Sequence, residues 1–307
     1  MRTYNKLDVE LTTHLQGGHG PAHADDYPNV YVLPGRARDY YYPNTLPLLN
    51  GEPDFTESPS TMWLHDHAMD VAGPKVWSGL AGFYLLTHEL ECDLVRRNVL
   101  PRASYDIPLA LQDRKFNSDG TLFYKLLDHN GPLGDGWLAN RRVQPFLKVE
   151  LQKYRLQPLN GCNARFLELR LSGVQPFTKL GKDSCLYNNA VKEDCEVLCP
   201  GERADVAIKF SHCVQEIHPC SSLTYSYDCR PSGNPRCGDS YDGDHDGRDY
   251  DRDDKQGYGF GYGMGSRDSY GYVDKSKGYR PDDQKCDDDR YGCGCIPWLK
   301  FVVEGSK

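Results

Sequence analysis

The sequence predicts an all-β protein made of β-sandwich domains. Three observations lead to this class. Apolar and polar residues alternate with period two through many short segments, Gly- and Pro-containing turn signals separate these segments, and no segment has a convincing helical period. Several short strands at this spacing are typical of a sandwich or barrel. A length of 307 residues suggests two domains.

The first region, residues 1–92, contains three segments that we expect to be strands. They are separated by loops over residues 19–61 and by a turn near Gly73 and Pro74. The three segments read "LDVELTTHLQ", "STMWLHDHAM" and "SGLAGFYLLTHE".

The second region, residues 105–210, has a longer series of segments with strand-like alternation. These segments read "YDIPLALQDR", "TLFYKLL", "QPFLKVELQKYRLQPLN", "ARFLELRLS" and "ERADVAIKFS". A further strand, "IPWLKFVVEG", comes near the end of the chain. A lone strand must pair with something, so we assign residues 296–303 to the same domain as residues 105–210.

Residues 211–295 differ from the rest of the chain and are expected to be a Cys-containing, Asp/Gly/Tyr-rich disordered insertion. Between Asp239 and Cys295 there are fifteen Asp, nine Lys or Arg, eleven Gly and eight Tyr, and no Glu, Leu or Ile. With almost no aliphatic surface to bury, such a segment cannot offset the entropy lost on ordering. Domains tolerate long inserted loops because closure entropy grows only slowly with length.

Charge, hydropathy and cysteine content limit the partners and the compartment. The net charge of −8 argues against nucleic acid as a partner, and no run of 18 apolar residues indicates a membrane span. The twelve cysteines favour disulfides and an extracellular location, although they could instead be free or metal-bound. No secretory signal is visible at the start of the chain, so we expect the N-terminus to be incomplete.

The strongest chemical signal is a pair of histidines in one expected strand. His65 and His67 lie two residues apart, and in a strand their side chains project from the same face. His14 and Gln16 share a face of the preceding expected strand in the same way. Imidazole binds Cu, Zn, Fe and Ni well. The pair alone fits an exposed polar strand face equally well, so it does not establish a metal site.

Longer motifs around these histidines resemble the multicopper oxidases, specifically the branch of spore-coat laccase, bilirubin oxidase and phenoxazinone synthase. The motifs are "HLQGGHGPAHADDYP", "LPGRARDYYYPN" and "MWLHDHAMDVAGPKVWSGLAGFYLL". The resemblance covers most of residues 11–210 together with 296–303. It implies cupredoxin-like Greek-key domains, of which residues 1–92 form a partial first domain, and an oxidoreductase that couples phenol or metal oxidation to O2 reduction.

The resemblance also implies roles for individual residues. His14 matches a type 2 copper ligand, and His65 and His67 match two type 3 copper ligands. Gln16 stands where the family has a further type 3 histidine, so this copper ligand is expected to be lost. Asp25 matches an acidic residue linked to proton supply during O2 reduction. Trp63 matches a family tryptophan, for which we expect a packing role.

The chain also departs from the family pattern in ways that affect activity. The amide oxygen of Gln16 is a poor substitute for imidazole at copper. No H-x-x-H-x-H or H-C-H motif, which holds type 1 copper and further ligands in the family, occurs in the sequence. We therefore expect a truncated and partly degenerate member. It would not be competent alone and would need a third domain from a partner chain or a homo-oligomer.

A second candidate metal site lies in the acidic segment. "DGDHDGRDYDRD" fits the spacing of a calcium loop, with ligands from Asp242, Asp244, Asp246, Arg248 (through its carbonyl) and Asp253. A solvated acidic tract with loose affinity for cations explains the same composition. An alternative function follows: a non-catalytic extracellular protein that binds divalent cations or forms a matrix on a degenerate cupredoxin scaffold.

Overall fold

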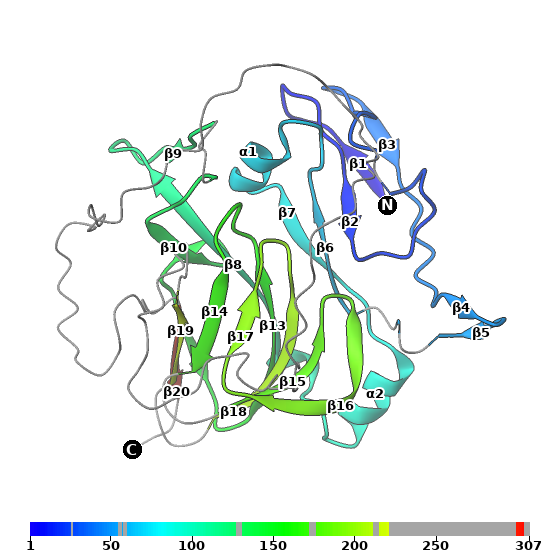
Figure 1. Ribbon diagram of the computed structural model, residues 1–307, viewed down its shortest axis with the longest axis vertical. Helices are drawn as coiled ribbons and strands as arrows, with labels where there is room; N and C mark the ends of the chain where they lie inside the picture. Colours follow the sequence, from blue (N-terminus) through cyan, green and yellow to red (C-terminus); the bar gives the residue numbers. More distant parts are fainter. Residues whose placement is uncertain are drawn as a thin grey trace, which may run out of the picture.

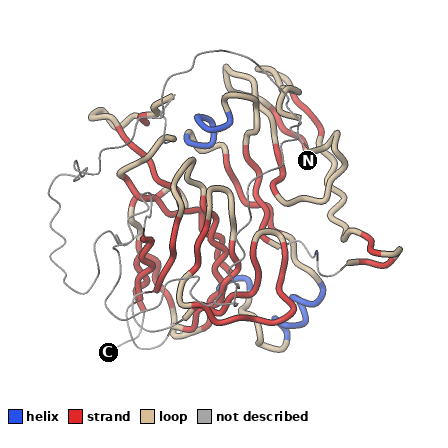
Figure 2. The backbone as a smooth tube through the Cα atoms, viewed as in Figure 1, coloured by secondary structure: helices blue, strands red, loops and turns tan. Residues whose placement is uncertain are grey.

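The computed structural model confirms the all-β class, because strands dominate and helices are few (Figures 1 and 2). It describes residues 1–210 apart from 26, 55–56, 58–59, 127–130 and 172–175, and the strands at 215–220 and 299–303. The candidate calcium loop and most of the acidic insertion lie outside the described residues. Within the described part, no helix is long and apolar enough to span a membrane.

The N-terminal region contains a three-stranded antiparallel sheet of order β2-β6-β7 and two small two-stranded antiparallel sheets. The sheet consists of β2 (His14–Gln16), β6 (Thr61–His65) and β7 (Ala81–Leu85). The small pairs are β1 (Arg2–Tyr4) with β3 (Ala37–Asp39), and β4 (Leu48–Leu49) with β5 (Glu52–Pro53). The central strand β6 is buried along its first three residues and half-buried at the last two.

An eight-stranded sheet forms one layer of the larger sandwich, with order β11-β10-β8-β13-β18-β15-β16 and β9 paired to β8. Its strands are β8 (Asp106–Phe116), β9 (Leu122–Phe123), β10 (Gly136–Ala139), β11 (Arg142–Val143), β13 (Lys153–Asn160), β15 (Phe177–Lys182), β16 (Cys185–Glu193) and β18 (Ala204–Lys209). The central pair β8 and β13 is parallel, while β18 runs antiparallel to β13.

A five-stranded sheet of order β12-β20-β19-β14-β17 forms the second layer. Its strands are β12 (Phe146–Val149), β14 (Leu167–Leu171), β17 (Glu196–Leu198), β19 (Gln215–Cys220) and β20 (Leu299–Val303). The last strand, β20, pairs in parallel with β12 and antiparallel with β19. Residues 299–303 therefore lie in the same sheet as β12 and β14, although a long segment separates them in sequence.

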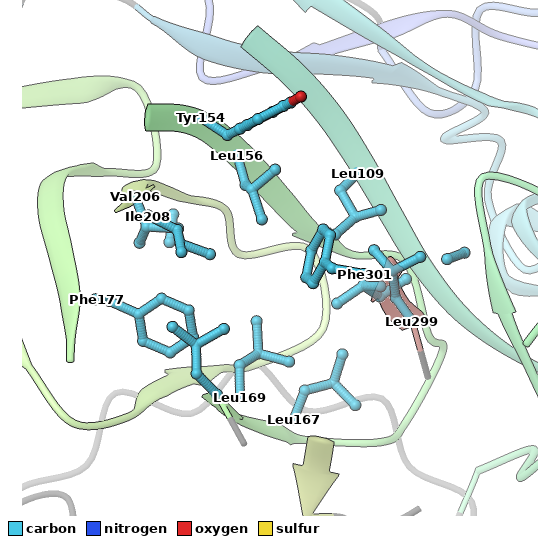
Figure 3. Close-up of a cluster of buried hydrophobic side chains, with 14 of the residues drawn as sticks. Leu109, Tyr154, Leu156, Leu167, Leu169, Phe177, Val206, Ile208, Leu299 and Phe301 are labelled. Carbon is cyan, nitrogen blue, oxygen red and sulfur yellow. The ribbon is translucent and has the colours of Figure 1, made fainter. Parts of the chain in front are cut away.

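The main core lies between these two layers, and Figure 3 shows part of its cluster of buried hydrophobic side chains. Strand β14 alternates buried and half-buried residues, which places Leu167, Leu169 and Leu171 on the inner face. Leu156 of β13 and Phe301 of β20 meet them there and are almost completely buried. Burial of each such side chain contributes roughly 1.5–3 kcal/mol, so period-two patterning largely accounts for the sandwich.

The structure contains two α-helices, whereas no helix was expected from the sequence, so that expectation was wrong. Helix α1 (Ala72–Trp77) replaces the turn expected near Gly73 and Pro74. Proline is accepted in a first helical turn because its missing N–H has no intrahelical partner there. Helix α2 (Glu89–Arg96) begins at His88, and a short 3-10 helix (Ala103–Tyr105) precedes β8. Both α-helices are short, so neither shows a sustained period.

Candidate metal centre

Three histidine rings meet at one end of the small sheet. Antiparallel pairing of β2 and β6 places His14 directly opposite His65, and His67 follows just beyond the end of β6. The ring centroids lie 5.2 Å apart for His14 and His65, 5.0 Å for His14 and His67, and 5.6 Å for His65 and His67. Rings that share one tetrahedral ion through bonds of about 2 Å have centroids roughly 5 Å apart. The spacing of the rings therefore suits a metal.

Asp66, between the two histidines, points inward and fixes the turn that carries them. Its side chain is buried, and its carboxylate accepts N–H groups of Thr12 at 2.9 Å and Ala68 at 3.0 Å. The ammonium of Lys75 lies 3.5 Å from the same carboxylate. The Thr12 hydroxyl in turn accepts the backbone N–H of His67 at 2.8 Å. This network sets the backbone path from which His65 and His67 project.

His65 is held neutral, with one ring nitrogen left for a ligand. Its Nδ1–H donates to the Asp66 carbonyl at 2.7 Å, so the lone pair of the neutral ring is on Nε2. Burial lowers the pKa of His65 to about 4, with smaller effects from the neighbouring histidines. The Trp63 ring stacks on the imidazole with centroids 4.1 Å apart. Trp63 is buried and therefore packs as predicted, and it also fixes the plane of a candidate ligand.

His67 supplies the second donor. Its Nδ1 atom is buried and makes no hydrogen bond within the described structure. A buried polar atom without a partner is costly unless something satisfies it, and a metal ion would do so. His65 and His67 thus form a half-site of two imidazoles, a donor set that copper accepts.

His14 is arranged differently, because both of its ring nitrogens are engaged. Nδ1 lies 2.6 Å from the carboxylate of Asp25, and Nε2 lies 3.1 Å from the side-chain amide of Gln16. A glutamine amide can present its oxygen or its nitrogen, so the contact occupies Nε2 whichever tautomer His14 adopts. The three rings are close, but only two have a nitrogen that is free of such contacts.

Among the described residues, no group of three His, Cys, Asp or Glu side chains is placed to hold a metal ion, and the donors free of other contacts here are those of His65 and His67. The structure brings together His14, Gln16, Asp25, His65 and His67 from the sequence prediction. It places none of the five candidate calcium ligands, which fall outside the described ranges. Sequence reasoning missed Asp66, Thr12 and Lys75. The only sequence signal for them was the acidic residue between the histidines, which a regular strand would direct away from them.

The structure tests the predicted disulfides for only some of the cysteines. Cys92, Cys162, Cys185 and Cys199 are free thiols. Burial raises the pKa of Cys162 well above its usual value, so this thiol stays protonated inside the sandwich core. Cys195 is disulfide-bonded, and the side chains of the cysteines from Cys213 onward lie outside the described part of the chain.

Known proteins resemble this chain over much of its length. Its sequence is 34% identical over 230 residues to a laccase from Bacillus stratosphericus, a match covering 68% of this chain and 42% of the laccase. Its structure matches the multicopper oxidase McoA of the hyperthermophile Aquifex aeolicus with a TM-score of 0.63 and 28% identity, over 71% of this chain and 47% of that chain. A laccase from Pediococcus acidilactici matches with a TM-score of 0.60 and 32% identity, over 70% and 45% of the two chains.

No family model matches the sequence. The chain spans less than half the length of the relatives described above. The aligned relatives share the cupredoxin-like β-sandwich architecture, which agrees with the fold predicted from the sequence.

Proposed function

We propose that this chain, which belongs to the multicopper oxidase family, binds copper through His65 and His67 as part of a copper-dependent oxidoreductase site. The observation that carries the proposal is the neutral ring of His65 beside the unpartnered, buried Nδ1 of His67. Metal binding requires unprotonated imidazole, and burial keeps His65 in that form at neutral pH. Bound copper would supply one-electron chemistry for oxidising a phenol or a metal ion with O2.

The remaining residues of the cluster support such a site in distinct ways. Asp66 and Trp63 orient the two ligand rings, by fixing the turn and by stacking. Asp25 is about one-third exposed and contacts the ring of His14, so it can exchange protons between solvent and the cluster. This contact is the reason for proposing Asp25 as the group that supplies protons during oxygen reduction.

Two imidazoles are fewer ligands than a copper ion takes up, so further donors must complete the site. We assign them to residues outside the described part of the chain or to a partner chain, which includes a second copy of this one. Oxidase activity of the chain by itself is then expected to be low, and it should rise when the partner that completes the site is present.

Copper loading of the purified chain tests the proposal. Inductively coupled plasma mass spectrometry after loading and dialysis should find bound copper in the wild type. The count should fall at least tenfold in His65→Ala and in His67→Ala. His23→Ala is the matched control, because His23 lies in an exposed turn and should leave the count unchanged. Equal copper content in all three variants would refute the assignment.

A second candidate function is non-catalytic cation binding. The observation that favours it is the engagement of both His14 nitrogens, which leaves fewer free donors than a redox site needs. Calorimetric titration of the full chain with calcium tests it, with Asp242→Asn and Asp253→Asn as variants. Calcium binding that both variants weaken would support this function, and no heat at millimolar calcium would reject it.

A further inference from the structure

The side chain of Gln16 contacts Nε2 of His14, the nitrogen through which His14 could bind a metal. Gln16 and His14 project from the same face of β2, two residues apart. The Oε1 atom of the amide lies 3.1 Å from Nε2 of His14, and a flip of the amide puts its NH2 group at the same place. Both side chains are half-buried, so solvent competes only partly for this contact.

Asp25 prepares His14 for metal binding at the same nitrogen. The carboxylate of Asp25 accepts the Nδ1–H of His14 at 2.6 Å, which places the lone pair of the neutral ring on Nε2. The Gln16 amide then bonds to this lone pair with its NH2 group, which is the flipped amide orientation, since an amide oxygen only accepts. A carboxylate on the far nitrogen of a histidine is the common arrangement behind metal-binding imidazoles, since it fixes the tautomer and raises the basicity of the ligand. His14 therefore has the orienting partner of a metal ligand, but Gln16 holds its donor atom.

We propose that the Gln16 amide keeps Nε2 of His14 out of the metal site, so that the wild-type chain holds copper through His65 and His67 without His14. The inference rests on the proposed function, since it assumes copper at this cluster. It goes further by assigning Gln16 the control of ligand number and affinity. Removing the amide converts a site of two imidazoles into a site of three.

The expected gain in copper affinity follows from the hydrogen bond that Gln16→Leu removes. A neutral hydrogen bond contributes about 1 kcal/mol net, which corresponds to roughly fivefold in a dissociation constant. Gln16→Leu removes the hydrogen bond and keeps most of the side-chain volume. Copper(II) should bind this variant at least about fivefold more tightly than the wild type, because His14 no longer has to break a contact before it can bind.

A double-mutant cycle between Gln16 and His14 tests the proposal. Copper(II) dissociation constants are measured by competition with a chromophoric chelator, and the number of bound imidazoles by pulsed electron paramagnetic resonance. His14→Ala should change wild-type affinity less than about twofold. In the Gln16→Leu background the same change should remove the whole gain. The imidazole count should be two in the wild type and three in Gln16→Leu.

Controls separate this inference from the function on which it rests. Gln152→Leu, in the bend before β13, removes an amide elsewhere and should leave affinity unchanged. Copper binding that survives His65→Ala would overturn the proposed function itself. Binding that depends on His65, but shows no change in affinity or imidazole count in Gln16→Leu, would overturn only the role of Gln16. A count of three bound imidazoles in the wild type would also overturn the role of Gln16.

Discussion

At the scale of single residues, the buried carboxylate of Asp66 does most to shape the histidine cluster. It accepts two backbone N–H groups and faces the ammonium of Lys75, which also donates to the Glu10 carbonyl. Removing one partner of a buried charge pair leaves the other charge uncompensated, which costs about 3–5 kcal/mol. From the sequence, Asp66 is only the residue between His65 and His67. In the structure, its hydrogen bonds fix the turn from which these two side chains project.

Asp66→Ala should therefore lower the free energy of unfolding by about 3–5 kcal/mol in urea titrations. Asp66→Asn keeps an acceptor oxygen and should cost less. Both should weaken copper binding, since the turn that carries His65 and His67 loses its anchor. Asp8→Ala, in the exposed bend after β1, serves as the control and should stay within about 0.5 kcal/mol of the wild type. A similar small effect for Asp66→Ala would contradict this role.

Asp106 gives the protein a predictable pH dependence. Burial, opposed by the Arg155 guanidinium and reinforced by Asp205 and Glu91, raises the pKa of Asp106 to about 6. The folded state thus binds a proton between about pH 4 and 6 that the unfolded state does not. The contribution of Asp106 to stability is therefore greatest below pH 4 and is lost as the pH rises through 6.

Asp106→Asn should accordingly be more stable than the wild type by on the order of 1–2 kcal/mol above pH 6, and the difference should shrink towards pH 4. Urea titrations at pH 4, 5, 6 and 7 measure it. Asp119→Asn is the control, because hydrogen bonds from Thr121 lower the pKa of Asp119 and it lies at an exposed turn. A constant difference between Asp106→Asn and wild type at every pH would show that Asp106 does not titrate in this range.

At the scale of elements, helix α2 depends on a capping histidine. The His88 side chain accepts the N–H of Leu90 at 3.1 Å, and the Glu91 carboxylate accepts the N–H of His88 at 2.9 Å. His88→Ala should lower the free energy of unfolding by about 1 kcal/mol, and His88→Asn should recover most of that loss, since asparagine is a good N-cap. Thermal unfolding checks both. An alanine variant as stable as the asparagine variant would show that the cap contributes nothing.

The sequence predicted the longer inner strands of the sandwich, because period-two burial is a local property. It did not single out β10, β11, β15, β16 and β17, of which β16 is mostly exposed and β15 alternates poorly. Strand β19 corrects the expectation that all of residues 211–295 are disordered, because residues 215–220 pair with β14 and β20. Helix α2 is short, and it places the charged residue Glu91 in the interior, where it forms an ion pair with Arg155, 2.7 Å away in β13. Contacts of this kind join distant segments and leave no periodic signal in the sequence.

At the scale of the whole molecule, buried arginines join the small sheet to the large sandwich. Arg203, just before β18, donates through Nε to the carbonyl of Thr61 in β6 at 2.9 Å and through Nη2 to the Ser184 hydroxyl at 3.0 Å. Gly17, in the turn after β2 with φ of +88°, approaches so closely that an added Cβ would collide with Ser184. Arg155 makes a second link, because it donates to the Ser60 hydroxyl at 3.1 Å and to the carboxylate of Asp205.

These links predict that the histidine cluster and the sandwich unfold together. Calorimetry of the wild type should give one transition, with equal calorimetric and van't Hoff enthalpies. Arg203→Met leaves the Thr61 carbonyl without its donor and should cost about 2–4 kcal/mol. Because the lost contact crosses between the sheets, the small sheet should then unfold first and split the transition in two. Its copper should be released in the earlier step.

Arg142→Met, on the exposed strand β11, is the matched control, since it removes a guanidinium without breaking a contact between the sheets. It should keep a single transition and release copper only at the wild-type midpoint. A single transition for Arg203→Met at an unchanged midpoint would mean that Arg203 does not couple the sheets. The coupling has a functional consequence as well. The metal half-site lies on a sheet of three short strands, so the stability of the large sandwich holds His65 and His67 in place.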